Sequence, residues 1–284
     1  MSVNVKKQKT EEGGSTNMRI FVSGDVSGAG KSTVSLGLLG SLLKSGFKSD
    51  EIAYIKPATQ GLQATLTAQY CLEKKIDCQH IGPLVFYRGF TKEFLDGKTQ
   101  SSADLLKEIT DAVDKISFGK KITVIDGVGY PAVGSIVGVS NADIANACRA
   151  PVLLVIRPGL GDCVDMFNLC STFFTSQGCQ VLGLIINKIE GSGLMKKSMC
   201  VPAYIEKYKP QCKVFALLPK SEHLNTITNG EIEACQIAFR KVSADAKHEV
   251  SRLSAQHLEA LEKFVVEFSS GLDMDSLLGM VSSR

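Results

Sequence analysis

The feature that most constrains this chain is a glycine-rich segment at residues 24–33, Gly-Asp-Val-Ser-Gly-Ala-Gly-Lys-Ser-Thr. The apolar run at residues 19–23 predicts a strand before it, and the apolar spacing over residues 31–44 predicts a helix after it. Backbone N–H groups of such a turn, continued into a helix N-terminus, form a cradle for phosphate. In this pattern Lys31 reaches the β- and γ-phosphates and the Ser32 hydroxyl binds Mg²⁺. The segment therefore predicts a phosphate-binding loop for ATP and Mg²⁺.

The loop departs in length from the common spacing. Its first glycine is Gly24 and Asp25 occupies the usual position, so the loop is one residue longer than G-x-x-x-x-G-K-[ST]. A second lysine near the start of the loop is absent, which argues against the filament-forming and membrane-partitioning ATPases. The residues that we predict to bind the nucleotide within the loop are Gly24, Ser27, Gly28, Ala29, Gly30, Lys31, Ser32 and Thr33.

Apolar runs alternate with helical patterns along the rest of the chain. The runs are continuous, as expected of parallel strands buried on both faces. We therefore predict an α/β fold of the P-loop NTPase type, a doubly wound, mostly parallel sheet flanked by helices. The predicted later strands are residues 52–55, 122–125, 152–156, 181–186 and 214–218, and the predicted later helices are residues 103–116, 142–149, 163–177 and 199–208.

Three polar residues follow predicted strands, and we expect them to meet the phosphate loop. Lys56, Asp126 and Asn187 each come at the end of a run. A doubly wound sheet binds its ligands at the carboxyl ends of its strands, so these side chains converge although they are far apart in sequence. Each residue also has a simpler interpretation. Lys56 could be a solvated loop lysine, Asp126 a carboxylate that forms a turn, and Asn187 a residue that caps a strand.

Composition excludes several classes of protein. The net charge of +3 is small and the lysines are dispersed, which argues against a nucleic-acid partner. No apolar run approaches the roughly 18 residues of a membrane span, so no membrane partner is expected. The four histidines show no metal-ligand spacing, and no Gly-x-Ser-x-Gly nucleophile motif is present. Nucleophilic and metallo-hydrolytic mechanisms are therefore disfavoured.

The cysteines and the chain ends bear on location and domain organisation. Nine cysteines without a Cys-x-x-Cys pair or a secretory segment predict reduced thiols and a cytoplasmic protein, with an organelle left open. We expect residues 1–17 to be a disordered tail and residues 18–284 to be one domain. We expect residues 231–284 to form its helical extension, with the amphipathic part at residues 231–268 packed on the sheet. A helix that binds a partner is the alternative.

Four segments in order resemble a known family. They are the long loop at residues 24–32, Lys56-Pro57, Asp126-Gly-Val-Gly129 and Ile185-Ile-Asn-Lys188. Together they resemble dethiobiotin synthetase and its relatives, among them the ATP domains of cobyrinic acid a,c-diamide synthases. The resemblance covers roughly residues 18–230, and residues 271–278 are similar to the end of the cobyrinate-type domains.

The resemblance implies an ATP- and Mg²⁺-dependent ligase that activates a small carboxylate or carbamate by phosphoryl transfer. Lys31 and Lys56 would be catalytic, Ser32 and Asp126 would bind the metal, and Asn187 would read the adenine edge. The substrate would be a small amine or carboxylate, and the protein a homodimer. Chemistry of this kind depends on in-line positioning and on neutralising the charge of the transferred group.

Two departures from the family pattern leave alternatives open. Tyr130-Pro131 stands where the family has a glycine pair that shapes the substrate pocket, and a second metal-binding aspartate has no clear counterpart. A catalytically inactive, nucleotide-binding regulatory module is therefore one alternative. An ATP-dependent amidation domain of the cobyrinate type is the other.

Overall fold

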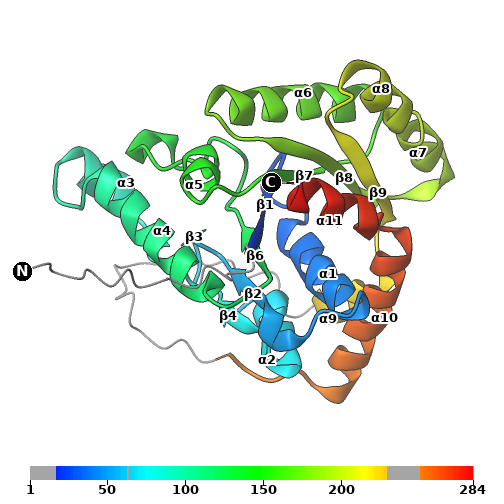
Figure 1. Ribbon diagram of the computed structural model, residues 1–284, viewed down its shortest axis with the longest axis horizontal. Helices are drawn as coiled ribbons and strands as arrows, with labels where there is room; N and C mark the ends of the chain where they lie inside the picture. The colour runs from blue at the N-terminus through cyan, green and yellow to red at the C-terminus, as the bar shows by residue number, and fades with distance from the viewer. Residues whose placement is uncertain (1–16, 63, 229–249, 284) are drawn as a thin grey trace, which may run out of the picture.

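The computed structural model describes residues 17–62, 64–228 and 250–283. At its centre is a seven-stranded, wholly parallel sheet of order β4-β2-β6-β1-β7-β8-β9 (Figure 1). This sheet confirms the predicted doubly wound α/β fold. Its strands are β1 (Met18–Gly24), β2 (Ile52–Ile55), β4 (Asp77–Gln79), β6 (Ile122–Asp126), β7 (Val152–Ile156), β8 (Val181–Ile189) and β9 (Lys213–Pro219), and β3 (Ala58–Thr59) pairs separately with β5 (Leu84–Val85).

Helices cover both faces of the sheet because successive strand residues point to opposite sides. In β1, Ile20 and Val22 join one hydrophobic core and Phe21 joins the other. The core of Ile20 is covered by α1 (Lys31–Lys44), α2 (Leu66–Lys74), α9 (Glu222–Thr228), α10 (Ala255–Gly271) and α11 (Met274–Ser282). The core of Phe21 is covered by α3 (Phe90–Leu95), α4 (Ser102–Ser117), α5 (Asn141–Ala147), α6 (Gly161–Ser176), α7 (Gly191–Ser198) and α8 (Val201–Tyr208). Single 3₁₀ turns span η1 (Ser49–Glu51) and η2 (Ser135–Val137).

The C-terminal helices α10 and α11 lie against the core that contains Ile20. α10 packs mainly on α1, whose Gly37 and Gly40 let the backbones approach, since a Cβ at either would overlap Phe268 or Val265. α11 contacts β1, β8 and β9. The predicted amphipathic stretch is thus represented by α10, although its part at residues 231–249 and the predicted tail at residues 1–16 lie outside the described residues.

Some boundaries differ from those expected. The strand predicted at residues 181–186 continues to Ile189, and its register with β9 shifts between Ile186 and Ile189. Asn187 is therefore inside β8, not beyond it. Lys188 adopts a left-handed φ of 62° at this irregularity. The predicted elements do not include α2, α3, α7, α9 or the short strands β3, β4 and β5, because none of these has a long periodic pattern.

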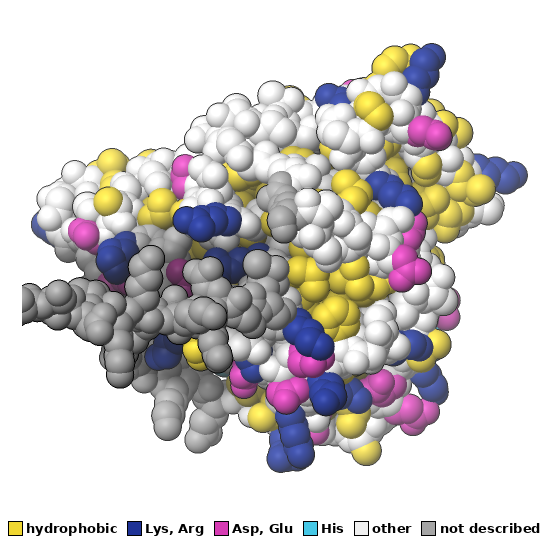
Figure 2. All heavy atoms as spheres, viewed as in Figure 1, with side chains coloured by type: hydrophobic (Ala, Val, Ile, Leu, Met, Phe, Trp, Pro, Cys, Tyr) yellow, Lys and Arg dark blue, Asp and Glu magenta, His cyan; other side chains and the backbone are white. Residues whose placement is uncertain are grey.

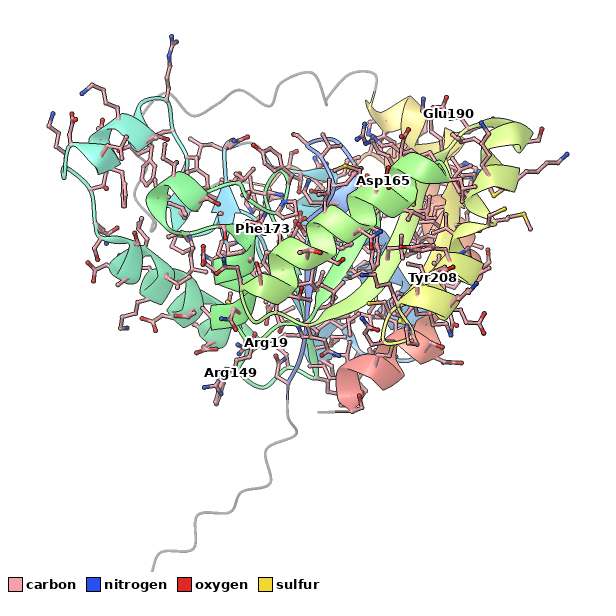
Figure 3. The ribbon with its side chains drawn as sticks, turned by 90° about the horizontal axis from the view of Figure 1, so that it is seen from above. Arg19, Arg149, Asp165, Phe173, Glu190 and Tyr208 are labelled. Atoms are coloured by element: carbon pink, nitrogen blue, oxygen red, sulfur yellow. The ribbon has the colours of Figure 1, made fainter. Side chains whose placement is uncertain are left out.

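The parallel strands give the molecule two distinct ends. Figure 3 shows Arg19 and Arg149, which lie at the amino ends of β1 and β7, opposite Asp165 of α6 and Glu190, which follows β8. In the view of Figure 2, basic and acidic side chains are interspersed over the surface. No described helix combines the length and the apolar character that a membrane crossing demands.

Candidate functional site

The glycine-rich loop joins the carboxyl end of β1 directly to α1. Gly30 precedes the helix with φ 96°, and no side chain caps the first turn. The first N–H groups of a helix have no partner within it, so those of Lys31, Ser32 and Thr33 are available to an anion. Ala29 is buried, whereas Ser27 lies exposed at the tip of the loop. The loop therefore has the form of the phosphate cradle that the sequence predicts.

Three donors from different parts of the chain converge on one carboxylate oxygen. Asp126 is fully buried, and its Oδ2 accepts hydrogen bonds from Ser32 Oγ at 2.7 Å, Tyr54 OH at 2.8 Å and Lys56 Nζ at 3.0 Å. Lys56 Nζ also lies 3.5 Å from Ser32 Oγ. The structure thus brings together the predicted residues Ser32, Lys56 and Asp126 at the carboxyl edge of the sheet.

The second oxygen of Asp126 indicates where a cation fits. Asp126 Oδ1 is buried and has no hydrogen-bond partner among the described residues. A buried acceptor left in this state costs free energy, and a hard cation beside it would remove that cost. The Ser32 hydroxyl and the Asp126 carboxylate are oxygen donors of the kind that Mg²⁺ prefers. The residues present therefore fit a magnesium ion.

The described residues around Asp126 do not form a larger metal-binding cluster. No group of three or more His, Cys, Asp or Glu residues is placed there to hold a metal. Beside the loop, Thr67 of α2 donates its hydroxyl to the Ser32 carbonyl at 2.8 Å. Because Mg²⁺ usually keeps several waters and binds substrate phosphates, two protein ligands are enough for such a site.

Lys31 is a buried cation at the mouth of the loop. Only 7% of its surface is exposed, and its Nζ lies 3.5 Å from the Val26 carbonyl oxygen. Burial lowers the pKa of Lys31 from 10.5 to about 8, with Lys56 and Lys188 acting in the same direction and Asp126 and Asp25 against it. A desolvated ammonium interacts strongly with any anion that reaches it.

Asn187 and Lys188 of β8 hold the outer side of the loop. Asn187 Nδ2 donates to the Ala29 carbonyl at 3.0 Å, and Lys188 Nζ donates to the Gly28 carbonyl at 2.7 Å. A Cβ on Gly30 would overlap Asn187 Nδ2, so the two segments pack closely. The structure therefore shows Asn187 supporting the loop, while its role in reading adenine remains a prediction.

Several residues of the site were not predicted from the sequence. Asp25 is buried, and its Oδ2 accepts from Arg157 Nε at 3.0 Å, which ties the loop to the end of β7. Arg157 follows one apolar run and Lys188 lies near the end of another. Their position after a predicted strand is the sequence signal that points to them. Tyr54 carries no such signal, because an aromatic residue inside an apolar run is typical of a core residue.

The segment with Tyr130-Pro131 is held at the edge of the site. Asn141 Nδ2 donates to the carbonyl oxygens of Val128 and Tyr130, at 2.7 Å each, and Asn141 Oδ1 accepts from Val128 N at 3.1 Å. Pro131 is buried, whereas Tyr130 is 49% exposed. The Tyr130 ring is thus half open to solvent, while its own carbonyl oxygen is held by Asn141.

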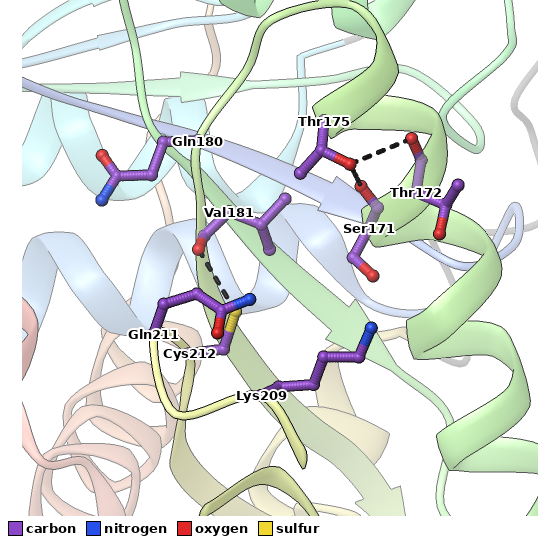
Figure 4. Close-up of a pocket in the computed structure, with 8 residues that line it drawn as sticks. All are labelled: Ser171, Thr172, Thr175, Gln180, Val181, Lys209, Gln211 and Cys212. Atoms are coloured by element: carbon purple, nitrogen blue, oxygen red, sulfur yellow. Dashed lines mark hydrogen bonds between the residues drawn. The ribbon is translucent and has the colours of Figure 1, made fainter.

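A separate pocket of about 220 Å³ contains none of the predicted site residues (Figure 4). It lies near the amino end of β8, between the last turns of α6 and the turn before β9. The hydroxyl of Thr175 donates to the carbonyl oxygens of Ser171 at 2.9 Å and Thr172 at 3.2 Å, within its own helix. Its lining residues are Ser171, Thr172, Thr175, Gln180, Val181, Lys209, Gln211 and Cys212.

Known proteins of related sequence include two kinds of ATP-dependent or cobyrinate-forming synthase. The ATP-dependent dethiobiotin synthetase BioD of Xanthomonas euvesicatoria pv. vesicatoria (strain 85-10) is 24% identical over 206 residues, which cover 65% of this chain and 88% of that protein. The cobyrinate a,c-diamide synthase of Clostridium tetani (strain Massachusetts / E88) is 23% identical over 274 residues. That match covers 90% of this chain and 53% of the synthase, so this chain spans about half the length of that relative.

The chain is also similar to a solved structure, and separately it matches a family model. The signal recognition particle 54 kDa protein from Aeropyrum pernix K1 is similar with a TM-score of 0.47 and 16% identity, over 73% of this chain and 42% of that one. The model of the AAA domain family matches residues 18–228. The chain therefore belongs to the AAA domain family, within the P-loop superfamily that includes the dethiobiotin synthetases.

Proposed function

We propose that this protein is an ATP- and Mg²⁺-dependent ligase that phosphorylates a small carboxylate or carbamate, as dethiobiotin synthetase does, and then joins it to an amine. The observation that supports this most is the cluster around Asp126. It places a candidate metal ligand, Ser32, and a second lysine, Lys56, within one hydrogen-bonded group at the mouth of the phosphate loop. A simple nucleotide-binding module would need the loop but not the second lysine.

Each residue has a distinct part in the proposed reaction. The N–H groups of the first turn of α1 bind the phosphates, and Lys31 neutralises the charge that develops on the transferred group. Ser32 and Asp126 would hold Mg²⁺, which supplies charge neutralisation at the phosphate oxygens. Asn187 and Lys188 keep the loop in the conformation that aligns the γ-phosphate.

Lys56 is the residue that we assign to the acceptor. Its ammonium lies 3.5 Å from Ser32 Oγ, beside the position of the terminal phosphate of a bound nucleotide. There it can orient the attacking carboxylate or carbamate oxygen and reduce its repulsion from the phosphate. Holding the two reactants in line in this way supplies a large part of the rate enhancement in phosphoryl transfer.

An amidation of the cobyrinate type is the second candidate. The similarity to the cobyrinate synthase extends over 90% of this chain, which is more than the 65% matched by the dethiobiotin synthetase. Both reactions begin with phosphorylation of a carboxylate or carbamate, and they differ in the amine that follows. The site around Asp126 serves either, so the acceptor must be identified by experiment.

The test is the release of phosphate from ATP. Purified protein with Mg²⁺, bicarbonate and diaminopelargonate should release phosphate at a rate at least tenfold above a Lys56→Met variant that still binds ATP. Release with ammonia and a corrinoid carboxylate, but not with diaminopelargonate, would establish the amidation instead. Tight ATP binding without release in any mixture would overturn the ligase proposal in favour of the regulatory module.

A further inference from the structure

One buried hydroxyl beside the candidate metal position has no part in the proposed reaction. Tyr54 lies in β2, next to β6 (Figure 1), and its side chain is fully buried in the core that contains Ile20. Its register partner in β6 is Val124, which stands two residues before Asp126. Residues two apart share a face of the sheet, so the Tyr54 ring and the Asp126 carboxylate lie on the same face. The Tyr54 hydroxyl reaches Asp126 Oδ2 at 2.8 Å.

The chemistry of this pair fixes which group donates. An ionised carboxylate only accepts hydrogen bonds, so the Tyr54 hydroxyl is the donor. A buried hydroxyl costs free energy unless it is hydrogen-bonded, and a phenylalanine would fill nearly the same space without that cost. The bond to Asp126 is therefore what the hydroxyl contributes to this part of the sheet.

The bond from Tyr54 selects which oxygen of Asp126 is left open. Oδ2 accepts from Ser32, Tyr54 and Lys56, whereas Oδ1 is buried and has no hydrogen-bond partner among the described residues. The last torsion of an aspartate side chain is soft, so an unrestrained carboxylate would exchange its two oxygens. A donor that is fixed in the core cannot follow that rotation. Tyr54 thus keeps Oδ1 at the position that fits a cation.

The three donors to Oδ2 are not equivalent once a cation occupies that position. The Ser32 hydroxyl is itself a candidate metal ligand, and Lys56 carries a positive charge that the cation repels. Lys56 is also the residue assigned to the acceptor, and its side chain is 13% exposed, so the core does not enclose it. Tyr54 is neutral and fully enclosed. It is therefore the donor that stays on Oδ2 when the site is filled.

We propose that Tyr54 is a positioning residue for the metal: it holds Oδ2 of Asp126, so that Oδ1 faces the cation while Lys56 moves to the acceptor. This role rests on the magnesium site of the proposed function, but not on the ligase reaction. Groups that hydrogen-bond a metal-binding carboxylate typically change the affinity for the metal by about 10- to 100-fold. Tyr54 acts in this way through Asp126, without contact with the substrate.

The first experiment measures metal binding in the full chain and needs no turnover. Mn²⁺ is titrated into the complex with ADP and followed by electron paramagnetic resonance. Tyr54→Phe should raise the Kd for Mn²⁺ by about tenfold, while the Kd for ADP in EDTA stays within about twofold of the parent value. The matched control is Tyr70→Phe, which removes a hydroxyl from a fully buried tyrosine of the same core. Its Kd for Mn²⁺ should change by less than about twofold.

The sign of a second substitution separates positioning from general support of the carboxylate. Lys56→Met also removes a donor from Oδ2, but it removes a competing positive charge with it, so the Kd for Mn²⁺ should fall by about threefold or more. An unchanged Kd in Tyr54→Phe, or equal losses in Tyr54→Phe and Tyr70→Phe, would overturn the role of Tyr54. Weaker Mn²⁺ binding in Lys56→Met would overturn the movement of Lys56 away from Asp126.

Phosphate release distinguishes a positioning residue from a catalytic one. Tyr54→Phe should raise the Mg²⁺ concentration that gives half of the maximal rate by about tenfold, while kcat at saturating Mg²⁺ stays within about threefold of the parent value. A large loss of kcat at an unchanged Mg²⁺ requirement would contradict the positioning role. If the parent releases no phosphate in any mixture, the ligase proposal fails, and the Mn²⁺ titrations still decide the role of Tyr54.

Discussion

The two ends of the sheet both carry polar groups, but they satisfy them differently. At the carboxyl end, Lys31 and Asp126 are charged and buried, and Asp126 Oδ1 has no partner among the described residues. At the amino end, the pocket in Figure 4 is lined by Thr175, whose hydroxyl donates to carbonyls of its own helix, and by Lys209. The fold thus leaves Asp126 Oδ1 without a hydrogen-bond partner among the described residues, whereas the Thr175 hydroxyl has its partners within its own helix.

This difference shows which property marks a functional site. A buried charge without full compensation costs free energy, so it persists where a ligand completes it. Volume alone carries no such information, because a pocket with satisfied polar groups is also a natural consequence of imperfect packing between helix ends. We therefore assign the chemistry to the carboxyl end, and the predictions below change one end while leaving the other intact.

The largest expected effect comes from removing the buried lysine of the loop. Lys31→Ala should lower ATP-dependent phosphate release by about 100-fold or more, because the transition-state charge loses a desolvated cation. Lys209→Ala, which removes a lysine from the other end, should leave the rate within about twofold. The measurement is a steady-state phosphate assay with saturating Mg²⁺. Equal losses in the two variants would contradict the contrast between the ends.

Lys31 should also make the stability of the free protein depend on pH. Its pKa is lowered from 10.5 to about 8 in the folded state, so between these values the unfolded state binds more protons. Stability therefore rises with pH through this window, and the full cost of the charge, about 3 kcal/mol, is present below pH 8. Lys31→Met should be more stable than the parent at pH 7, and the difference should vanish above pH 10.5.

Urea denaturation of both proteins at pH 7 and pH 10.5 measures that difference directly. The attraction of Asp126 and Asp25 is already contained in the pKa of about 8, so the gain at pH 7 is expected to be close to the value of about 3 kcal/mol. A parent protein that equals Lys31→Met in stability at both pH values would show that burial of this lysine has no cost. Lys31 would then no longer distinguish the carboxyl end of the sheet from the amino end.

Substitutions of two loop glycines test how closely the loop packs against Asn187. Gly30 has φ 96°, and a Cβ there would overlap Asn187 Nδ2, whereas Gly28 has φ 83° with nothing within 4 Å of such a Cβ. Gly28→Ala should cost about 1 kcal/mol from backbone strain alone. Gly30→Ala should cost about 2–3 kcal/mol, since the overlap adds to the strain, and it should abolish ATP binding. Thermal unfolding and titration with ATP measure the two effects, and equal costs would show that Asn187 moves aside freely.

The sequence was sufficient for the framework of this site because its signals are local. Residues 31–44 carry a helix-spaced pattern and form α1 over those residues. Lys56 and Asp126 end buried runs, so the rule that parallel strands share a carboxyl edge was enough to bring them together. These inferences need only the spacing of apolar residues and the common direction of the strands. Both can be read from a few neighbouring residues.

The rest depends on contacts between distant residues, which periodicity does not encode. Tyr54 stands in an apolar run and is indistinguishable there from a core residue. Only the pairing of β2 with β6 shows that its hydroxyl lies within hydrogen-bonding distance of Asp126. The edge strand β4 escapes prediction because its three residues are too few to show alternation. The extension of β8 to Ile189 depends on a bulge, and Lys188 takes a left-handed conformation there that its residue type does not favour.

The smallest expected effect distinguishes the two roles of Asn187. Its Nδ2 is already donated to the Ala29 carbonyl, so Asn187→Ala removes one hydrogen bond from the loop and should weaken the binding of ATP and GTP alike by about threefold. If the amide oxygen also accepts from the adenine amino group, ATP loses a further hydrogen bond and its affinity should fall by about tenfold in total. We expect the unequal loss, because donating Nδ2 to the loop leaves the oxygen able to accept. Equal losses for the two nucleotides, measured by calorimetry at fixed Mg²⁺, would reduce Asn187 to a support of the loop and leave the choice of base to other residues.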